Sequence, residues 1–406
     1  VPMAIVPFAW EGSGVESPFD VAGLISADLG QSGRFQPMDV RDMVSRPSLP
    51  EDVSYQDWRI VEVDYLVIGR VIEDAPDRYT VVFQLFNVLQ GEEIVGYRLT
   101  TTEAELRRAS HRVSDMIFEE LTGIRGVFGT RIAYVSEQQE GTERQDGTEQ
   151  QFRLIVSDAD GANALEVTSS AEPLMSPSWS PDGRKLAYVS FEGAQSSIYV
   201  QTLRTGARDR VSARAGINGA PVFSPDGRKL ALTLSRDQGN VDVYMLDLAT
   251  QVLIRLTQNL AIDTEAVWAP DGESIFFTSD RAGGPQIYNV SARPGARAQR
   301  VTFEGSYNAR PRVSPSGDRL AVVHEDRGNY RIALVDPDTG LTQVLSNGRS
   351  DESPSFAPNG ALIIYATQEG GRGVLASVSV DGRIHRQIAS VAGQVREPVW
   401  SPFPRT

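Results

Sequence analysis

The chain has 406 residues, a formal net charge of −14 at pH 7 and no cysteine. The absence of cysteine excludes disulfide bonds and thiolate catalysis, and the surplus of acidic side chains argues against a nucleic-acid-binding surface. No apolar run approaches the roughly 18 residues that a membrane-spanning helix needs, so direct insertion into a membrane is not expected. The length accommodates a ring of repeats together with one further domain, and we expect a monomer.

Residues 1–125 carry no repeat and are predicted to form a small N-terminal α/β domain. Ser17 is the predicted N-cap of a first helix, and Thr102 to Glu105 has the pattern of a capping box that opens an amphipathic helix. The glycine-rich segment 126–130 is the predicted linker to the rest of the chain. The predicted strands of this domain lie at 4–8, 65–69, 79–88 and 94–100.

One short motif recurs through the remaining residues, 131–406. It is a bulky apolar residue followed by a turn of the type Ser-Pro-Asp-Gly, whose residues are favoured at the successive positions of a type I turn. Three further short apolar runs complete four strands per repeat. Six units of this period predict a six-bladed β-propeller. The copies begin 43–45 residues apart, at Trp179, Phe223, Trp268, Val313, Phe356 and Trp400.

The propeller region begins in the middle of a repeat. Residues 131–136 match 185–190 position by position, although no inner strand or turn precedes them. The missing inner strand lies near the other end of the chain, around 398–400, so we expect one blade to combine residues 131–168 with the C-terminal strand. The predicted fold class is therefore α+β multi-domain: a small α/β domain, then a propeller closed by pairing of the C-terminal strand with the first blade. The polar residues 137–151 are predicted to form a mobile hairpin tip.

The sequence contains no arrangement that supports catalysis. A hydrolase nucleophile would need a G-x-S-x-G turn, and the nearest segment, 30–34, lacks the last glycine. The three histidines, His111, His324 and His385, are far apart without metal-ligand spacing. His111 and His324 are predicted to be surface or blade residues. We therefore predict that the chain is not an enzyme and has no cofactor or metal site, with a cation in the acidic channel as an open alternative.

The residues at the start of each inner strand should surround one mouth of the central channel, because inner strands line the axis of a propeller. These residues are small or polar, which would admit a loop of a partner protein. Two interpretations stay open from the residues alone: ordinary loops between blades, or a surface that binds protein. The predicted protein-binding residues of the mouth are Met175, Ser176, Asn218, Gly219, Ala220, Asp263, Thr264, Glu265, Asn308, Ala309, Arg310, Asp351, Glu352, Ser353, Arg396 and Glu397.

Several segments outside the turns resemble one known family. They are Ile-Val-Pro-Phe at 5–8, Leu-Thr-Gly-Ile-Arg-Gly at 121–126, Pro-Leu-Met-Ser-Pro at 173–177 and Asn-Gly-Ala-Pro at 218–221. Together with the repeats, they resemble the TolB family, the periplasmic component of the Tol-Pal system of Gram-negative bacteria, over essentially the whole chain. The resemblance implies an N-terminal α/β domain, a six-bladed propeller, no enzymatic activity and a periplasmic location.

The resemblance also implies partners. It implies that the peptidoglycan-associated lipoprotein Pal docks at the propeller mouth and that TolA of the inner membrane binds the N-terminal region. Other outer-membrane proteins and colicins are further implied partners, and the implied role is to support outer-membrane integrity and envelope constriction at cell division. Carried over by motif, the Pal-docking positions are Asn218, Gly219, Ala220, Thr264 and Glu265.

The sequence departs from the family pattern in two places. The family usually has His before Asn-Gly-Ala-Pro, where this chain has Ile217. The extended segment ahead of Ile-Val-Pro-Phe is almost absent, so we expect this chain to lack the TolA-binding arm. The alternative from another class is the regulatory propeller of a peptidase or of a sugar-processing enzyme, which predicts activity or a bound small molecule.

Overall fold

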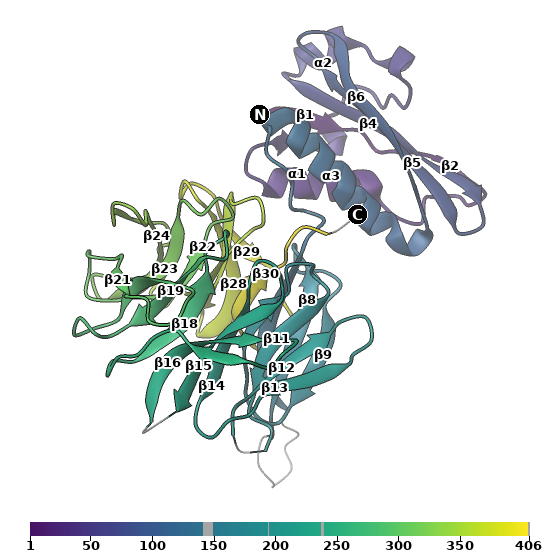
Figure 1. Ribbon diagram of the computed structural model, residues 1–406. Helices are drawn as coiled ribbons and strands as arrows, with labels where there is room; N and C mark the ends of the chain where they lie inside the picture. The colour runs from purple at the N-terminus through teal and green to yellow at the C-terminus, as the bar shows by residue number, and fades with distance from the viewer. Residues whose placement is uncertain (141–148, 194, 237–238, 405–406) are drawn as a thin grey trace. The chain divides into compact units, whose positions relative to one another are not determined.

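The structure is a computed structural model that describes residues 1–140, 149–193, 195–236 and 239–404. It contains two compact units, Val1–Gly129 and Thr130–Thr406, each with its own hydrophobic core (Figure 1). No helix in these residues combines the length and the apolarity that a membrane span requires.

The first unit is a mixed sheet with helices against it. The strand order is β3-β1-β4-β5-β6, with β2 paired to β4; β4, β5 and β6 form an antiparallel meander, and the other pairs are parallel. The strands are β1 (Pro2–Ile5), β2 (Ala9–Glu11), β3 (Gln36–Pro37), β4 (Tyr65–Ala75), β5 (Arg78–Asn87) and β6 (Glu92–Thr101). The helices are α1 (Val21–Gln31), α2 (Tyr55–Ile60) and α3 (Leu106–Thr122), with 3-10 turns η1 (Val40–Asp42), η2 (Pro50–Asp52) and η3 (Glu103–Glu105).

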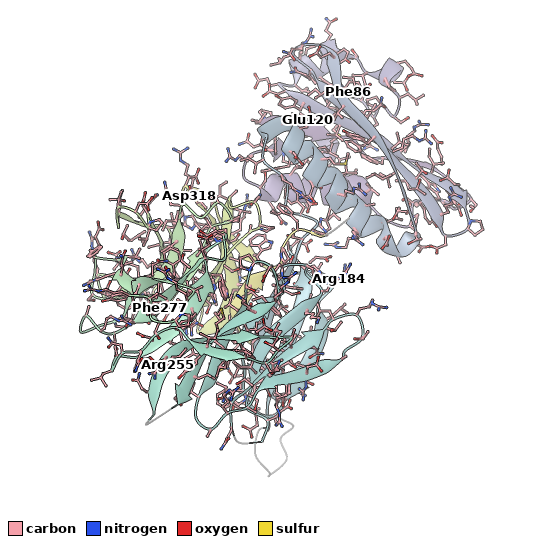
Figure 2. All side chains as sticks on the ribbon, in the orientation of Figure 1. Phe86, Glu120, Arg184, Arg255, Phe277 and Asp318 are labelled. Atoms are coloured by element: carbon pink, nitrogen blue, oxygen red, sulfur yellow. The ribbon has the colours of Figure 1, made fainter. Side chains whose placement is uncertain are left out.

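Helices α1 and α3 cover one face of this sheet. Leu29 of α1 and Ile117 of α3 are fully buried in one cluster with Phe83 of β5. Both helices place apolar residues three and four positions apart, which gives each of them one face to bury. Against the opposite face of the sheet, Trp58 of α2 packs with Phe86, and Figure 2 labels Phe86. The small α/β domain predicted from the sequence is thereby confirmed.

The starts of two helices differ from the sequence prediction. Asp20, not Ser17, is the N-cap of α1, because its carboxylate accepts a hydrogen bond of 2.8 Å from an amide of the first turn. Ahead of α3, Thr102 makes no side-chain capping bond, and Asp77 accepts from the Glu103 amide at 3.0 Å. The predicted capping box is therefore wrong, since a residue from the turn between β4 and β5 takes its place.

The predicted linker, 126–130, is held by α3 over most of its length. Asp115 of α3 accepts hydrogen bonds from the amides of Phe128 at 2.7 Å and Gly129 at 3.1 Å. A Cβ on Gly126 would lie 2.4 Å from the Asp115 carboxylate, so this close approach requires glycine. The first unit therefore extends to Gly129 instead of ending at 125.

In the described part of the second unit, six four-stranded antiparallel sheets form the blades of a β-propeller. The six-bladed architecture predicted from the repeats is confirmed. In the first five blades the strands follow the chain from the channel outward. The first blade consists of β10 (Leu174–Trp179), β11 (Lys185–Ser190), β12 (Ser197–Thr202) and β13 (Arg208–Ser212), and the second of β14 (Asn218–Phe223), β15 (Lys229–Arg236), β16 (Asn240–Asp247) and β17 (Leu253–Arg255). The third consists of β18 (Asp263–Trp268), β19 (Ser274–Ser279), β20 (Gln286–Ser291) and β21 (Gln299–Arg300), the fourth of β22 (Asn308–Val313), β23 (Leu320–Asp326), β24 (Asn329–Val335) and β25 (Thr342–Val344), and the fifth of β26 (Glu352–Phe356), β27 (Leu362–Glu369), β28 (Arg372–Ser379) and β29 (His385–Ile388).

The sixth blade joins strands from the two ends of the propeller region. Its order is β30-β7-β8-β9, made of β30 (Gln394–Trp400), β7 (Arg131–Glu140), β8 (Glu149–Asp158) and β9 (Leu165–Ser170). Strand β30 runs antiparallel to β7, with Trp400 opposite Ile132; Figure 1 shows the yellow β30 close to the teal strands of this blade. This is the pairing that we expect from the missing inner strand. The centre of the predicted hairpin tip, 141–148, lies outside the described residues.

In the first two complete blades, the serine of the repeated turn makes side-chain bonds within the turn. The Ser180 hydroxyl donates to the Asp182 carboxylate at 2.6 Å and accepts from the Lys185 amide at 2.9 Å. The fourth turn residue, Gly183, has φ of 68°, a conformation that glycine adopts without steric cost. Ser224 makes the same two contacts in the next blade, at 2.6 and 3.0 Å. Two other blades have Ala269 and Ala357 at this position and keep the backbone bond of the turn, from the Gly272 amide to the Ala269 carbonyl and from the Gly360 amide to the Ala357 carbonyl, both at 2.9 Å. The serine bonds therefore reinforce a turn that the backbone already makes.

These turns also contact one another around the ring. The glycine of each turn lies against the proline of the preceding one, at an ordinary van der Waals distance from the position of a Cβ. We call this set of contacts the turn ring. Its members are Gly227 with Pro181, Gly272 with Pro225, Gly317 with Pro270, Gly360 with Pro315, and Gly183 with Pro402, at 3.5–3.7 Å.

Replacing Trp400 by Ala should destabilise the propeller. Trp400 is 8% exposed, and its indole N–H donates to the Thr130 hydroxyl at 2.8 Å. Loss of this buried aromatic side chain leaves a cavity, so we expect the free energy of unfolding to fall by about 3–5 kcal/mol in urea titrations followed by circular dichroism. Leu165→Ala in the same blade is the control, because Leu165 is 69% exposed. Equal effects of the two substitutions would contradict a structural role for β30.

Candidate functional site

Each inner strand contains a bulge at the same place, where its register against the next strand shifts. One residue of each bulge adopts a left-handed backbone conformation, which costs a residue other than glycine about 1–2 kcal/mol. A bulge re-aims the side chain that it carries. We call these six residues the mouth ring: Ser176, Ala220, Glu265, Arg310, Ser353 and Glu397, with φ from 44° to 55°.

The mouth ring converges on the axis of the propeller. All six residues line one recess of about 40 Å³, together with residues that follow them on the inner strands. Each was predicted from the sequence to lie at the mouth, and the structure brings them together although they are spread over six repeats. Small side chains such as Ala220 occupy part of this ring, and charged side chains occupy the rest.

Arg310 spans the mouth ring. Its Nε donates to the Glu265 carboxylate at 2.9 Å, and its Nη1 donates to the Ser353 hydroxyl. Its Nη2 lies 3.8 Å from the Glu397 carboxylate, which also accepts from the backbone amide of Ser176. These contacts join five blades across the channel.

The carboxylates around Arg310 control its ionisation. Burial alone would lower the pKa of Arg310, but the negative charges of Glu265, Glu397 and Glu352 outweigh burial and raise that pKa. The guanidinium is therefore permanently charged and occupies the carboxylates nearest the axis. A cation in the mouth would have to displace it, so this arrangement favours a polar recess over a metal site.

Four predicted mouth residues lie below the surface. They expose 1% or less of their area and hold the loops between blades; for example, Asn218 accepts from the Arg214 amide at 3.0 Å. Their side chains position the mouth and are not available to a partner, which differs from the sequence prediction. The reason is that a polar residue at the start of an inner strand can satisfy the backbone groups of the adjacent loop. These residues are Asn218, Asp263, Asn308 and Asp351.

The remaining predicted residues have mixed environments. Glu352 is 45% exposed and lies 3.9 Å from Arg310, while Arg396 is 36% exposed and contacts Glu137 at 2.8 Å. Ala309 is buried inside its blade, so it cannot contact a partner directly. Half-buried residues complete the predicted set: Met175, Gly219 and Thr264.

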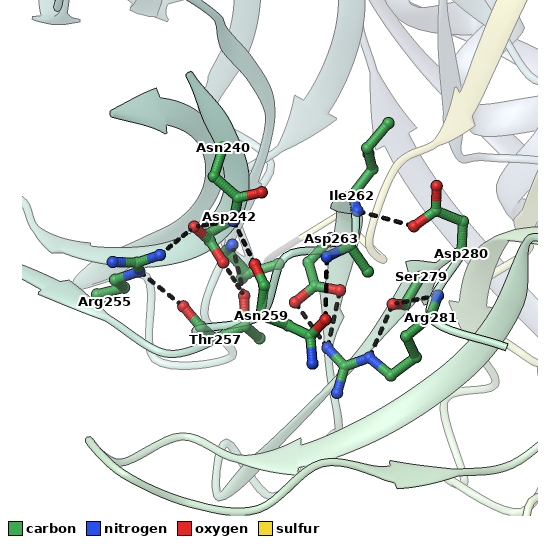
Figure 3. Close-up of polar contacts among 12 residues, drawn as sticks. Asn240, Asp242, Arg255, Thr257, Asn259, Ile262, Asp263, Ser279, Asp280 and Arg281 are labelled. Carbon is green, nitrogen blue, oxygen red and sulfur yellow. Dashed lines mark hydrogen bonds and ion pairs between the residues drawn. The ribbon is translucent and has the colours of Figure 1, made fainter. Parts of the chain in front are cut away.

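The loop before β18 is held between two ion pairs whose carboxylates are buried and whose arginines are partly exposed (Figure 3). The Asp242 carboxylate, 1% exposed, lies 2.5 Å from Arg255 on one side of the loop. The Asp263 carboxylate, fully buried, accepts from Arg281 at 2.7 and 2.8 Å on the other side. Two charge-assisted contacts of this kind restrict the loop strongly.

Three large aliphatic side chains project beside the mouth, and we call them the apolar rim. Leu260 and Ile262 belong to the restrained loop and are 100% and 51% exposed, and Ile217 in the preceding blade is 49% exposed. Sequence reasoning missed Leu260 and Ile262 and noticed Ile217 only as a departure from the family pattern. The available signal was an isoleucine directly before the polar first residue of two successive inner strands.

The predicted surface position of His111 is wrong. His111 is 3% exposed, and its Nδ1 lies 2.8 Å from the Asp28 carboxylate, which also accepts from the Ser114 hydroxyl at 2.7 Å. Asp28 comes from α1, so spacing along α3 could not show the pairing. His324 is a blade residue as predicted, with its Nδ1 2.9 Å from the amide oxygen of Asn308.

Both units match models of known protein families. Residues 118–404 match the family model of the TolB beta propeller domain, and residues 1–94 match that of the TolB amino-terminal domain. The chain belongs to the TolB family. It is 48% identical to the Tol-Pal system protein TolB of Xanthomonas euvesicatoria pv. vesicatoria over 404 residues, covering 99% of this chain and 90% of that protein. The TolB protein of Xanthomonas campestris pv. campestris has the same identity and coverage.

Solved structures of TolB proteins agree with this assignment. The crystal structure of TolB from Acinetobacter baumannii superposes with a TM-score of 0.89 at 39% identity, covering 99% of this chain and 96% of that one. A putative TolB from Agrobacterium tumefaciens, with a TM-score of 0.52 and 20% identity over 66% of this chain and 91% of that one, shares the fold. The chain is thus a Tol-Pal component with a β-propeller, and TolB membership agrees with the prediction that it is not an enzyme.

Replacing Arg310 by Met should weaken the propeller by leaving carboxylates without their partner. Arg310 is 30% exposed, so we expect a loss of about 2 kcal/mol in the free energy of unfolding, below the value for a fully buried pair. Urea unfolding measures this change. Arg319→Met, in the same blade, is the control, since Arg319 is 47% exposed and lies 3.4 Å from one carboxylate. An equal loss in both variants would refute a special role for the Arg310 contacts.

His324 should make propeller stability depend on pH. Burial lowers its pKa against the opposing charges of Asp326, Glu325 and Glu304. The pKa of His324 is lower in the folded chain than in the unfolded chain, where it is about 6.5. The contribution of neutral His324 to stability is therefore complete above about pH 6.5 and is lost as the pH falls. His324→Gln removes this charge change. The stability of the wild type relative to the variant should therefore decrease between about pH 7.5 and 5.5, and parallel stability curves would contradict the expectation.

Proposed function

We propose that this chain is a periplasmic adaptor of the Tol-Pal system that binds the lipoprotein Pal at the mouth of its propeller. Family membership supports the system, and the combination of the mouth ring with the apolar rim supports the binding surface. In this proposal the adaptor supports outer-membrane integrity and envelope constriction at cell division. TolA binding is assigned to the N-terminal unit, because residues 1–94 match the TolB amino-terminal domain and the family resemblance implies this region.

The mouth suits a segment of protein better than a small molecule. Its recess measures about 40 Å³, whereas sites for small molecules usually measure roughly 300–1,000 Å³. Protein interfaces combine a few apolar anchors with polar groups that fix orientation. Here the apolar rim offers aliphatic contacts beside a ring of one guanidinium and two carboxylates. These properties argue against the alternative, the regulatory propeller of a peptidase or of a sugar-processing enzyme, as far as that alternative predicts a bound small molecule in the mouth.

The restrained loop favours binding because its order is established before the partner arrives. The pairs Asp242–Arg255 and Asp263–Arg281 hold the segment that carries Leu260. A loop that is already ordered loses less conformational entropy on association than a flexible one. The exposed leucine is therefore a suitable anchor for an apolar side chain of the partner.

Ala220→Arg tests the assignment of the mouth. Ala220 lines the recess and is half-buried, so an arginine side chain would obstruct the mouth without entering a hydrophobic core. We expect the dissociation constant for the soluble domain of the cognate Pal to rise at least tenfold, or about 1.4 kcal/mol. Isothermal titration calorimetry measures the binding, and thermal unfolding should show a nearly unchanged melting temperature.

Ala207→Arg is the matched control, because Ala207 is exposed in a turn at the opposite end of the propeller. Its binding of Pal should equal that of the wild type. No binding by the wild-type chain, or the same loss in both variants, would overturn the proposal. A large fall in the melting temperature of Ala220→Arg would instead identify Ala220 as a core residue.

A further inference from the structure

The channel has a second concavity at the end opposite the mouth. It measures about 220 Å³, and we call it the turn-end cavity because it lies beside the turn residues Ser180 and Pro181. Its volume exceeds the roughly 30 Å³ share of one water molecule several times over, so it can hold a small solute. Its wall combines aliphatic and aromatic residues with three serines and one arginine: Pro177, Ser178, Trp179, Ser180, Pro181, Val222, Arg312, Ser355, Val399, Trp400 and Pro402.

Arg312 differs from its counterparts in the other repeats. It stands two residues after the mouth ring, at a position where three blades carry valine and two carry serine. It is the one ionisable side chain among the described residues that line the turn-end cavity. No carboxylate lines this cavity in that part of the chain. Its lining therefore carries a single positive charge. The equivalent residues are Ser178, Val222, Val267, Ser355 and Val399.

The contacts of Arg312 contrast with those of Arg310. The Nη1 of Arg312 donates to the carbonyl of Pro311 at 2.8 Å, and no ion pair within 4.0 Å joins Arg312 to a carboxylate among the residues that the structure describes. Arg310, by contrast, lies 2.9 Å from Glu265. A guanidinium has five N–H groups, so most of the donors of Arg312 remain available to the cavity.

The surroundings of Arg312 increase the need for a counter-charge. Burial lowers its pKa and the charge of Arg310 adds to that effect, while Glu265 and Glu397, which line the mouth recess together with Arg312, oppose it. An arginine side chain nevertheless stays protonated in proteins. A cation removed from water without a partner is costly, and a bound anion would reduce that cost.

Two hydroxyl groups add donors to the same wall. The Ser355 hydroxyl oxygen accepts from the backbone amide of Trp400 at 3.0 Å, which leaves its own proton available to donate. Ser178 stands at the equivalent position of another blade and lines the cavity as well. A guanidinium accompanied by hydroxyl donors, in a cavity whose described lining has no carboxylate, is a donor set that oxyanions prefer.

We propose that the turn-end cavity binds a small oxyanion, a phosphate or carboxylate group, through Arg312 with Ser178 and Ser355. Binding involves the guanidinium N–H groups and the serine hydroxyls as donors and the anion oxygens as acceptors. Arg312 also lines the mouth recess, but the binding of an anion in the turn-end cavity does not depend on the proposal for Pal. A competing explanation is that the carboxylates of the mouth ring already balance Arg312 across the channel, and it predicts that no anion binds.

Inorganic phosphate is the first probe. Titration of phosphate into the full chain at constant ionic strength, followed by phosphorus NMR line broadening, should give a dissociation constant on the order of 1 mM. In Arg312→Met the dissociation constant should rise at least tenfold. Arg319→Met is the control, because it removes an exposed arginine of the same blade, and its binding should match the wild type.

Arg312→Val is a second variant that guards against misfolding, because valine occupies the equivalent position in three blades. Both Arg312 variants should keep the wild-type melting curve in the absence of phosphate. Displacement of phosphate by acetate would extend the site to carboxylates, and failure of acetate to compete would restrict it to tetrahedral oxyanions. No phosphate binding by the wild type, or undiminished binding in folded Arg312 variants, would overturn the proposal.

Discussion

The left-handed residue at the bulge of each inner strand is the constraint on which the channel depends. Strands normally alternate their side chains between two faces, and a bulge interrupts that alternation locally. In this chain the interruption recurs at the same repeat position and directs the mouth ring toward one recess. Proline follows in five of the six repeats. Proline is compatible with an edge strand at a bulge because it has no N–H to contribute to the ladder.

Because the backbone is nearly the same in every blade, the chemistry of the channel is decided by which side chains occupy two positions per repeat. Arg310 and Arg312 illustrate this on one strand. Arg310 finds carboxylates on neighbouring blades, whereas Arg312, two residues farther on, faces valines and serines. Buried ion pairs contribute little net stability but constrain geometry. The contacts of Arg310 therefore define the shape of the mouth, while Arg312 gives the opposite end its own charge.

The periodic features could be predicted from the sequence because they repeat. Six copies of one turn were enough to identify the blades, and the unmatched first strand indicated that the C-terminal segment completes a blade. The mouth residues were also located, since they hold a constant offset from the turn. Contacts between segments distant in sequence could not be found in this way. Asp28 meets His111 across two helices, and Arg310 meets Glu397 across the channel.

Conformation at single positions was equally hidden from the sequence. Glutamate, arginine and serine rarely adopt positive φ, so the presence of these residues did not predict the bulges. Nor could composition show that Asn308 and Asp351 would be buried, because polar residues at loop ends are common on surfaces. These side chains are buried because they form hydrogen bonds with the adjacent loops, and those bonds depend on the folded backbone.

The turn ring bears on the order in which this chain can fold. Its contact between Gly183 and Pro402 unites the first complete blade with residues that the ribosome adds after every other blade. Until 394–402 emerge, β7 lacks its inner neighbour and the ring of prolines and glycines is open. The other blades can form before that segment is available, but the circle closes only when the segment has been added. Strand β7 therefore keeps an unpaired edge that can pair with another strand until 394–402 have arrived.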